Sequence, residues 1–340
     1  MARLAIVISA VGSIESLEGT LVSVLENRPA DCEIVVVLNR PYADPYDLAE
    51  EVRFLPPGRS VSTTGGINRA LATTRAPFVH LLAGGCQVSE GWADAALARF
   101  GDRQVGSVVP LIWDAQRSDR IFAAGVGYRR HGRRYLVGQG FQTLEPDQEQ
   151  AIVGPCGFAA FYRKAALDFV GGFSTRLGPR QADADMALVL RQAGFTVAFE
   201  PCSCVRASAE ADPAAAGFRQ ALCDERLFWR NLTKPGRARA LVEHAASVGL
   251  ELAGSFPRPR MFAQVIGRLA ACLEIGSHAR HHRALTELAA RGVLAGERVR
   301  IDRSHSAPAT STSTRPASLV AAHEDQSTAA SSSASCPLLG

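Results

Sequence analysis

Apolar runs alternate with helical periodicities through the first part of the chain. Residues 4–8 and 33–38 are apolar and rich in β-branched side chains, which predicts two buried strands. The residues between them place apolar side chains at helical spacing behind Ser13, a predicted N-cap: Ile14, Leu17, Leu21, Val24 and Leu25. A strand, a helix and a strand in this order form a βαβ unit, and such units build a parallel sheet with helices on both faces.

The alternation continues further along the chain. Helices are predicted at 67–74 and 92–100, strands at 78–82, 107–112 and 196–199, and a strand that returns to the sheet at 157–162. A helix over 183–193 ends at Gly194 and carries Asp183 and Asp185 in its first turn, where they suit the positive end of the helix dipole. Ligands of such sheets gather at the carboxyl ends of the strands.

The composition changes in the last third of the chain. Residues 218–292 have a helical pattern with apolar and basic faces, whereas the chain beyond Arg303 is rich in Ser, Thr, Ala and Pro. We therefore predict an α/β domain over 1–215, a helical extension over 216–302 and a disordered tail over 303–340.

Composition and charge exclude several classes of protein. The 340 residues are 47% hydrophobic, and the net charge of +4 is spread along the chain, which does not predict a nucleic-acid partner. The eight cysteines lack the paired spacings of a zinc site, and we interpret them as reduced thiols of a cytoplasmic protein. No apolar run reaches the length of a membrane span, so any membrane contact would be peripheral, at the inner face and through the helical extension.

Seven short segments stand in a recognisable order. They contain Ser9 after the first strand, Asn39 after the second, Asn68 in Gly65-Gly66-Ile67-Asn68-Arg69-Ala70, and Gly84 and Gly85 between a buried strand and Trp92. The later ones are the segment from Gly157 to Gly171-Gly172-Phe173, the run Ala182-Asp183-Ala184-Asp185-Met186, and residues 201–207, which contain Arg206.

In this order and spacing, residues 4–205 resemble the family 2 glycosyltransferases, which are inverting enzymes of GT-A fold that transfer a sugar from a nucleotide sugar. The resemblance implies a Rossmann-like, mostly parallel sheet flanked by helices, with Asp183 as the general base and Gly157 and Asp185 on the acceptor side. It implies that the donor is bound by six residues: Ser9, Asn39, Asn68, Gly84, Gly85 and Arg206. The resemblance leaves the acceptor unknown, with a polysaccharide, a lipid and a peptide as the alternatives.

One motif of that family is degenerate. Where the family carries a metal-binding Asp-x-Asp, this chain has Ala83, Gly84 and Gly85, and no histidine stands in 201–207 to complete a metal site. We predict no metal ligands, and a manganese or magnesium ion remains an alternative whose usual ligands are missing. Our hypothesis is that Arg206, or the basic run 129–134, neutralises the leaving diphosphate instead.

Other interpretations stay open for these residues. Asp183 is also a suitable helix-capping acid, Asn39 and Asn68 are suitable turn residues, Trp92 is a suitable packing anchor and the basic run is a suitable solvated turn. His278, His281 and His282 are interpreted as an exposed helix face. The alternative function is a catalytically inactive glycosyltransferase-like binding or scaffold protein. A dinucleotide-dependent oxidoreductase is disfavoured because no G-x-G-x-x-G follows the first strand.

Overall fold

A single large sheet organises the computed structural model, which describes residues 2–58, 62–207, 217–232, 236–256, 260–274, 276–287 and 290. All of these residues belong to one unit, residues 1–292. The predicted domain boundaries near 215 and 302, and the predicted tail 303–340, lie outside the described residues.

The central sheet has nine strands in the described part of the chain, in the order β3-β2-β1-β4-β10-β6-β11-β5, with β7 paired to β6. A separate two-stranded ribbon consists of β8 and β9. The bounds are β1 Leu4–Ser9, β2 Cys32–Val37, β3 Val52–Leu55, β4 Phe78–Ala83, β5 Cys86–Val88, β6 Val105–Asp114, β7 Ile121–Ala123, β8 Val126–Tyr128, β9 Arg134–Leu136, β10 Ala159–Arg163 and β11 Thr196–Ala207.

The first strands form the predicted parallel core. β1 pairs in parallel with β2 on one side and with β4 on the other, and every residue of β1 is buried. These strands are nearly continuous runs of Val, Ile and Leu, as expected for strands that are covered on both faces. β10 runs antiparallel between β4 and β6, so the sheet is mixed at its centre.

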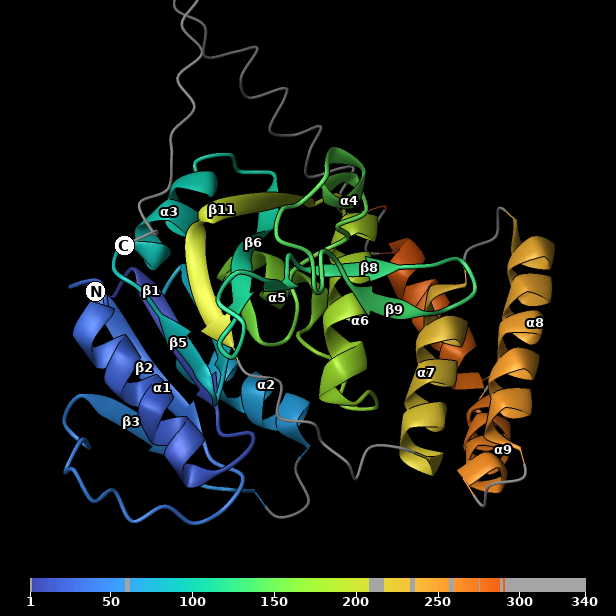
Figure 1. The fold of residues 1–340 in the computed structure, drawn as a ribbon, viewed down its shortest axis with the longest axis horizontal. Coiled ribbons are helices and arrows are strands. Elements are labelled where there is room, and N and C mark those ends of the chain that lie inside the picture. The colour runs from blue at the N-terminus through green and yellow to red at the C-terminus, as the bar shows by residue number, and fades with distance from the viewer. Residues whose placement is uncertain are drawn as a thin grey trace, which may run out of the picture. The chain divides into compact units, whose positions relative to one another are not determined.

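Helices cover this sheet (Figure 1). Their bounds are α1 Ile14–Asn27, α2 Thr63–Thr73, α3 Trp92–Arg99, α4 Pro146–Gln150, α5 Lys164–Val170, α6 Pro179–Gln192, α7 Phe218–Asn231, α8 Arg237–Ser255 and α9 Arg260–Cys272. A further helical segment spans residues 276–287. α2 packs on β1 and β2, α3 packs on β11 and β6, and α1 packs on β5. Ser13 caps α1 as predicted, because its side chain accepts a hydrogen bond from the Ser16 amide.

The helical extension consists of α7, α8, α9 and the segment 276–287. α7 contacts α6, α9 packs along α7, and α8 packs on α9. Figure 1 shows these helices grouped beside α6, away from β1 to β3. No helix in the described residues is long and apolar enough to cross a membrane.

Helix α6 begins earlier than the sequence pattern predicted. Gly178 is its N-cap and Pro179 occupies its first turn, so Asp183 and Asp185 lie beyond the first turn. Their predicted interaction with the helix dipole is therefore wrong, since that effect is confined to the first turn. Proline at the first helical position after a glycine is a start signal that the prediction overlooked.

The histidines of residues 276–287 were also predicted incorrectly. His278 is buried, and the ring of His282 hydrogen-bonds the carbonyl of Trp229 at 2.9 Å. This helical segment therefore packs against α7 with its histidines inward. Trp92, in contrast, is fully buried, which confirms its predicted packing role.

Candidate functional site

The carboxyl ends of β1, β2 and β4 meet at one edge of the sheet. Ser9 is aligned with Val37 of β2 and with Ala83 of β4. Ser9 is buried, and its carbonyl oxygen accepts a hydrogen bond from the Gly84 amide at 2.9 Å. This hydrogen bond holds the loop after β4 against the end of β1, at the edge where ligands of parallel sheets bind.

The loop Ala83-Gly84-Gly85 uses its own N–H groups within the protein. The Ala83 amide donates to the Phe158 carbonyl at 2.8 Å, and the Gly85 amide donates to Thr20 Oγ1 at 2.9 Å. A Cβ on Gly84 would lie 2.8 Å from the Val11 carbonyl oxygen, and Gly85 has a φ of 92°. A side chain is therefore excluded by close approach at Gly84 and strained by backbone geometry at Gly85.

A divalent cation does not fit this loop. Such an ion needs carboxylate, carbonyl or water oxygens around it, and neither Ala83 nor Gly85 offers a side-chain oxygen. Among the residues that the structure describes, no group of three or more His, Cys, Asp or Glu side chains is arranged to hold a metal.

Asp183 lies on α6 and is buried in a complete set of hydrogen bonds. Arg134 of β9 donates through Nε to Oδ1 at 2.9 Å and through Nη2 to Oδ2 at 2.6 Å. The amides of Gly157 and Ala184 donate to the same two oxygens at 2.9 and 2.6 Å. Burial disfavours the charge of Arg134, but the carboxylate of Asp183 outweighs it, so the pKa of Arg134 is raised above its ordinary value.

Residues 157 and 158 connect Asp183 to the loop. Gly157 donates its amide to Asp183, and Phe158 accepts the Ala83 amide through its carbonyl. The structure therefore brings the Ala83 loop, Gly157 and Asp183 together at one edge. Cys156, the preceding residue, is buried beside Asp183, and burial together with that negative charge raises the pKa of its thiol to about 11.

Asp185 faces a different part of the molecule. Arg230 of α7 donates to both of its oxygens, at 3.0 and 2.9 Å, and Asn231 donates to Oδ1 at 3.0 Å. Because Asp183 and Asp185 are two residues apart on a helix, they point to different sides. Asp185 therefore joins α6 to α7.

A cavity of about 220 Å³ lies beside Asp185. Its walls include the turn Gly171-Gly172-Phe173, Arg230 and His281. Burial, and then the charge of Arg230, lowers the pKa of His281 to about 4, so this ring is neutral at physiological pH. The cavity borders α6 on the side of Asp185, the residue that the sequence resemblance assigned to the acceptor side.

Asn68 and Asn39 occupy different environments. Asn68 of α2 donates through Nδ2 to the Phe173 carbonyl at 2.7 Å and accepts the Phe173 amide at 2.8 Å. Both halves of its amide are therefore used to hold α2 against the turn before α6. Asn39 is exposed just after β2, and its Oδ1 accepts a hydrogen bond from Arg40 Nε at 3.4 Å.

Two arginines lie near this edge. Arg206 is exposed on β11, opposite Gln87 of β5 and Trp113 of β6, and β5 follows directly after the Ala83 loop. Arg40, which the sequence analysis did not select, is exposed after β2 and donates to the Gly12 carbonyl. Its position next to Asn39 is the feature of the sequence that could have identified Arg40 as a candidate.

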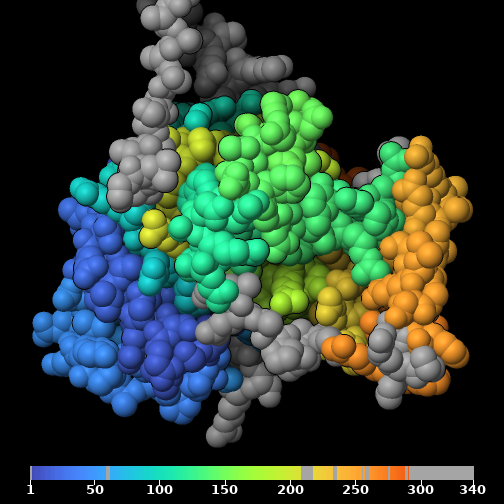
Figure 2. All heavy atoms as spheres, viewed as in Figure 1, coloured from blue at the N-terminus to red at the C-terminus, as the bar shows by residue number. Residues whose placement is uncertain are grey.

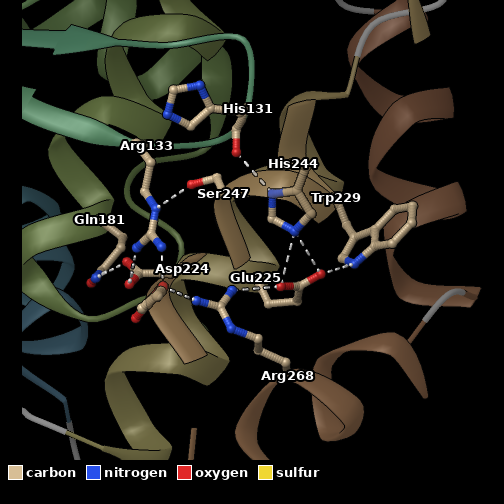
Figure 3. Close-up of polar contacts among 10 residues, drawn as sticks. His131, Arg133, Gln181, Asp224, Glu225, Trp229, His244, Ser247 and Arg268 are labelled. Atoms are coloured by element: carbon tan, nitrogen blue, oxygen red, sulfur yellow. Dashed lines mark hydrogen bonds and ion pairs between the residues drawn. The ribbon is translucent and has the colours of Figure 1, made fainter. Parts of the chain in front are cut away.

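The basic run 129–134 connects the sheet domain to the helical extension. Arg134 binds Asp183, whereas Arg133 forms ion pairs with Glu251 of α8 and with Asp224 of α7, the latter at 3.9 Å. Figure 3 shows Arg133 pointing into the contacts between α7 and α8. These two guanidinium groups are thus paired with carboxylates of the protein, and no local pattern of the sequence indicated Arg134 as the partner of Asp183.

Glu225 of α7 is the centre of a second buried network (Figure 3). It accepts hydrogen bonds from Trp229 at 2.8 Å, His244 at 3.2 Å and Arg268 at 2.9 Å. Burial alone would raise the pKa of Glu225, but His244 and Arg268 outweigh burial and lower it. His244 also contacts the His131 carbonyl at 2.8 Å, which anchors the turn between β8 and β9.

Comparisons with known proteins give a similarity of fold. No family model and no curated protein matches the sequence. The mannosyltransferase PcManGT from Pyrobaculum calidifontis, solved in complex with GDP-Man and Mn2+, matches with a TM-score of 0.50 and 14% identity, over 80% of this chain and 86% of that chain.

GalNAc-T7, solved with UDP, GalNAc and Mn2+, matches with a TM-score of 0.54 and 15% identity, over 68% of this chain. This chain spans 47% of the length of that GalNAc-T7 chain. Both matches, together with the mostly parallel sheet flanked by helices, identify the fold as that of the GT-A glycosyltransferases. The predicted fold class is confirmed.

Proposed function

We propose that this chain is a cytoplasmic, inverting glycosyltransferase of the family 2 type. It takes a sugar from a nucleotide-sugar donor and transfers it to an acceptor that is a polysaccharide, a lipid or a peptide. One observation carries the proposal: at the carboxyl edge of a GT-A sheet, the Ala83 amide binds Phe158 while the neighbouring Gly157 amide binds Asp183. The loop and the acid that such a transfer requires are therefore adjacent.

Asp183 is the proposed general base. An inverting transfer needs a carboxylate that accepts the proton of the acceptor hydroxyl while that oxygen attacks the anomeric carbon. Asp183 already accepts four hydrogen bonds, and two carboxylate oxygens offer about four acceptor sites. An acceptor hydroxyl must therefore displace one of the present donors, and the exposed Gly157 is the most accessible of them.

The leaving diphosphate needs positive charge in place of the missing Asp-x-Asp metal site. Arg206 is the proposed group, since it is exposed beside the loop and forms no ion pair with any described residue. Arg40 supports the same role from the end of β2. Arginine side chains stabilise phosphate oxygens through charge-assisted hydrogen bonds, so this chemistry requires no side-chain carboxylate in the loop.

A thermal-shift titration of the full chain with a panel of nucleoside diphosphate sugars, with and without manganese, tests the proposal. We expect one donor to stabilise the protein to the same extent in both conditions, because a ligand that binds only the folded state raises its stability. Asn39→Ala and Arg206→Ala are expected to weaken this shift. Val22→Ala is the control, since Val22 is exposed on α1.

A second candidate function is a catalytically inactive binding or scaffold protein. The saturated, buried carboxylate of Asp183 favours it, because such a group can serve packing alone. Turnover of the stabilising donor separates the two. The enzyme proposal expects Asp183→Asn to bind the donor and to lose transfer and donor hydrolysis. If no donor binds, or if wild type and Asp183→Asn show equal and negligible turnover, the transferase proposal is wrong.

A further inference from the structure

Helix α9 presents large apolar side chains outward and a charged side chain inward, which is the reverse of the usual arrangement in a surface helix. Its outward stripe consists of large apolar side chains that are between 58% and 89% exposed: Phe262, Ile266, Leu269 and, just beyond the helix, Leu273. The spacing of these residues places them on one line along the helix. Arg268, in contrast, points inward and is only 7% exposed.

The inward charge of α9 is fixed by strong contacts. Arg268 donates to Glu225 at 2.9 Å, a contact shown in Figure 3, and to Glu251 at 2.6 Å. Rotation of α9 to bury the apolar stripe would break both ion pairs and leave buried charges unpaired, which is costly. The outward position of the apolar stripe is therefore a stable property of the folded protein.

Helix α8 repeats this arrangement. Val242, Leu250 and, after the helix, Phe256 are exposed, while His244 and Glu251 face the interior network. The other exposed positions between Val242 and Leu250 are Ala245, Ala246 and Gly249, so this stretch of the outward face carries no charge. In the space-filling view the orange surface of α8 lies at the right edge of the described atoms (Figure 2).

The exposed charged side chains of α8, α9 and the segment 276–287 are mainly arginines. Arg237 and Arg260 are exposed at the starts of α8 and α9, and Arg280 and Arg283 are exposed on the segment 276–287. The acids of α8, and Glu274 after α9, are each paired with an arginine: Glu243 with Arg239, Glu251 with Arg133 and Arg268, and Glu274 with Arg176 and Arg226. Glu287, exposed at the end of the segment 276–287, is the exception.

We propose that the outward faces of α8 and α9 dock on the surface of an anionic lipid bilayer. Apolar side chains enter the interfacial layer and the exposed arginines of these helices contact lipid phosphates, which is the charge arrangement of interfacial helices. This inference does not depend on the proposed transferase activity.

Two other occupants fit less well. A protein interface carries about one hydrogen bond per 100–200 Å², and the exposed stripe of α9 has no hydrogen-bonding side chain. The chain's own residues 303–340 contain few large apolar residues, namely Leu319, Val320, Leu338 and Leu339, which is too few to cover both faces. A bilayer requires no matching polar groups and is the occupant that the charge pattern favours.

Co-sedimentation of the full-length protein with vesicles tests this proposal. We expect binding to vesicles of phosphatidylcholine with phosphatidylglycerol, weaker binding to phosphatidylcholine alone, and weakening by salt. Ile266→Glu with Leu269→Glu should lower the affinity for the anionic vesicles by more than about tenfold, because each side chain loses its apolar burial. Val22→Glu is the control, since Val22 is also an exposed apolar residue, on α1, and its substitution should not change binding.

The arginines give a second, independent measurement. Arg237→Gln and Arg260→Gln should each lower the affinity for anionic vesicles by about fivefold and leave binding to neutral vesicles unchanged. Circular dichroism of each variant establishes that it is folded.

Two results would overturn the proposal. One is a full-length protein that does not sediment with anionic vesicles, or that binds them equally well after the double substitution. The other is a dimer, detected by light scattering without lipid, that becomes monomeric in the double variant, because a second copy would then be the occupant. Neither measurement uses a nucleotide sugar, so failure here is distinct from failure of the proposed function.

Discussion

Arg134 and Asp183, which are 49 residues apart in the sequence, form a bidentate ion pair at the carboxyl edge of the sheet. The side chain of Asp183 is 3% exposed and that of Arg134 is 16% exposed. An ion pair this deeply buried stabilises the fold only as long as both partners are present, since removal of one leaves a desolvated charge.

Single substitutions of this pair are expected to be strongly destabilising. Arg134→Met and Asp183→Leu should each lower the free energy of unfolding by about 3–5 kcal/mol, and the double variant should lose less than the sum. Urea denaturation of the four proteins measures the coupling. Asp168→Asn is the control, because its ion pair with Lys164 has an Asp side chain that is 60% exposed, and it should cost less than about 1 kcal/mol. Additive losses would contradict a coupled pair.

Asn68 and Asn39 should respond differently to alanine. Asn68→Ala removes both hydrogen bonds to the Phe173 backbone and is expected to cost about 1–3 kcal/mol of stability. Asn39→Ala changes an exposed side chain and should alter stability by less than about 0.5 kcal/mol, while it weakens donor binding if the proposed function is correct. Thermal unfolding with and without the donor separates these two effects.

Gly84 should tolerate a methyl group poorly. A Cβ at this position would lie 2.8 Å from the Val11 carbonyl oxygen, which belongs to the backbone and moves only with its strand end. Gly84→Ala should therefore cost about 1–3 kcal/mol. Gly19→Ala in α1 is the matched control, because no atom lies within 4 Å of its added Cβ, and it should be neutral or stabilising by up to about 1 kcal/mol. Equal unfolding midpoints for the two variants would mean that the loop is not held as described.

Buried His80 should make the protein sensitive to mild acid. His80 lies fully buried in β4, and its ring stacks on the ring of Phe161 with the two centroids 3.8 Å apart. Burial lowers the pKa of His80 from 6.5 to about 3. The His80 imidazole of the unfolded chain therefore becomes protonated near pH 6.5, whereas the same ring stays neutral in the folded protein. The contribution of this group to stability is complete above pH 6.5 and falls as the pH decreases towards 3, by about 1.4 kcal/mol per pH unit.

Urea denaturation of wild type and His80→Asn between pH 7 and pH 4 checks this expectation. The variant should show a smaller loss of stability over this range than wild type, whatever its stability at pH 7. Parallel curves for the two proteins would show that His80 does not titrate on unfolding.

The sequence was sufficient to predict the sheet but not the partners of the site residues. The runs 4–8, 33–38 and 78–82 have the apolar character of buried parallel strands, so β1, β2 and β4 could be recognised locally. The contact between Asn68 and Phe173 spans 105 residues, and no local pattern encodes it.

The arginines illustrate the same limit. Arg133 and Arg134 were recognised as a basic run, yet their acids lie on α6, α7 and α8 and are brought near only by tertiary packing. The start of α6 was misplaced for a different reason, because Gly178 and Pro179 were not weighed as a helix start. Sequence patterns report the local chain, whereas the state of a carboxylate such as Asp183 depends on distant neighbours.

The adjacency of Arg133 and Arg134 has a mechanical consequence. Arg133 forms an ion pair with Glu251 of α8, and Arg134 forms one with Asp183 of α6. A single peptide unit therefore separates these two ion pairs. A displacement of α8 is therefore transmitted to Asp183 through almost no intervening chain.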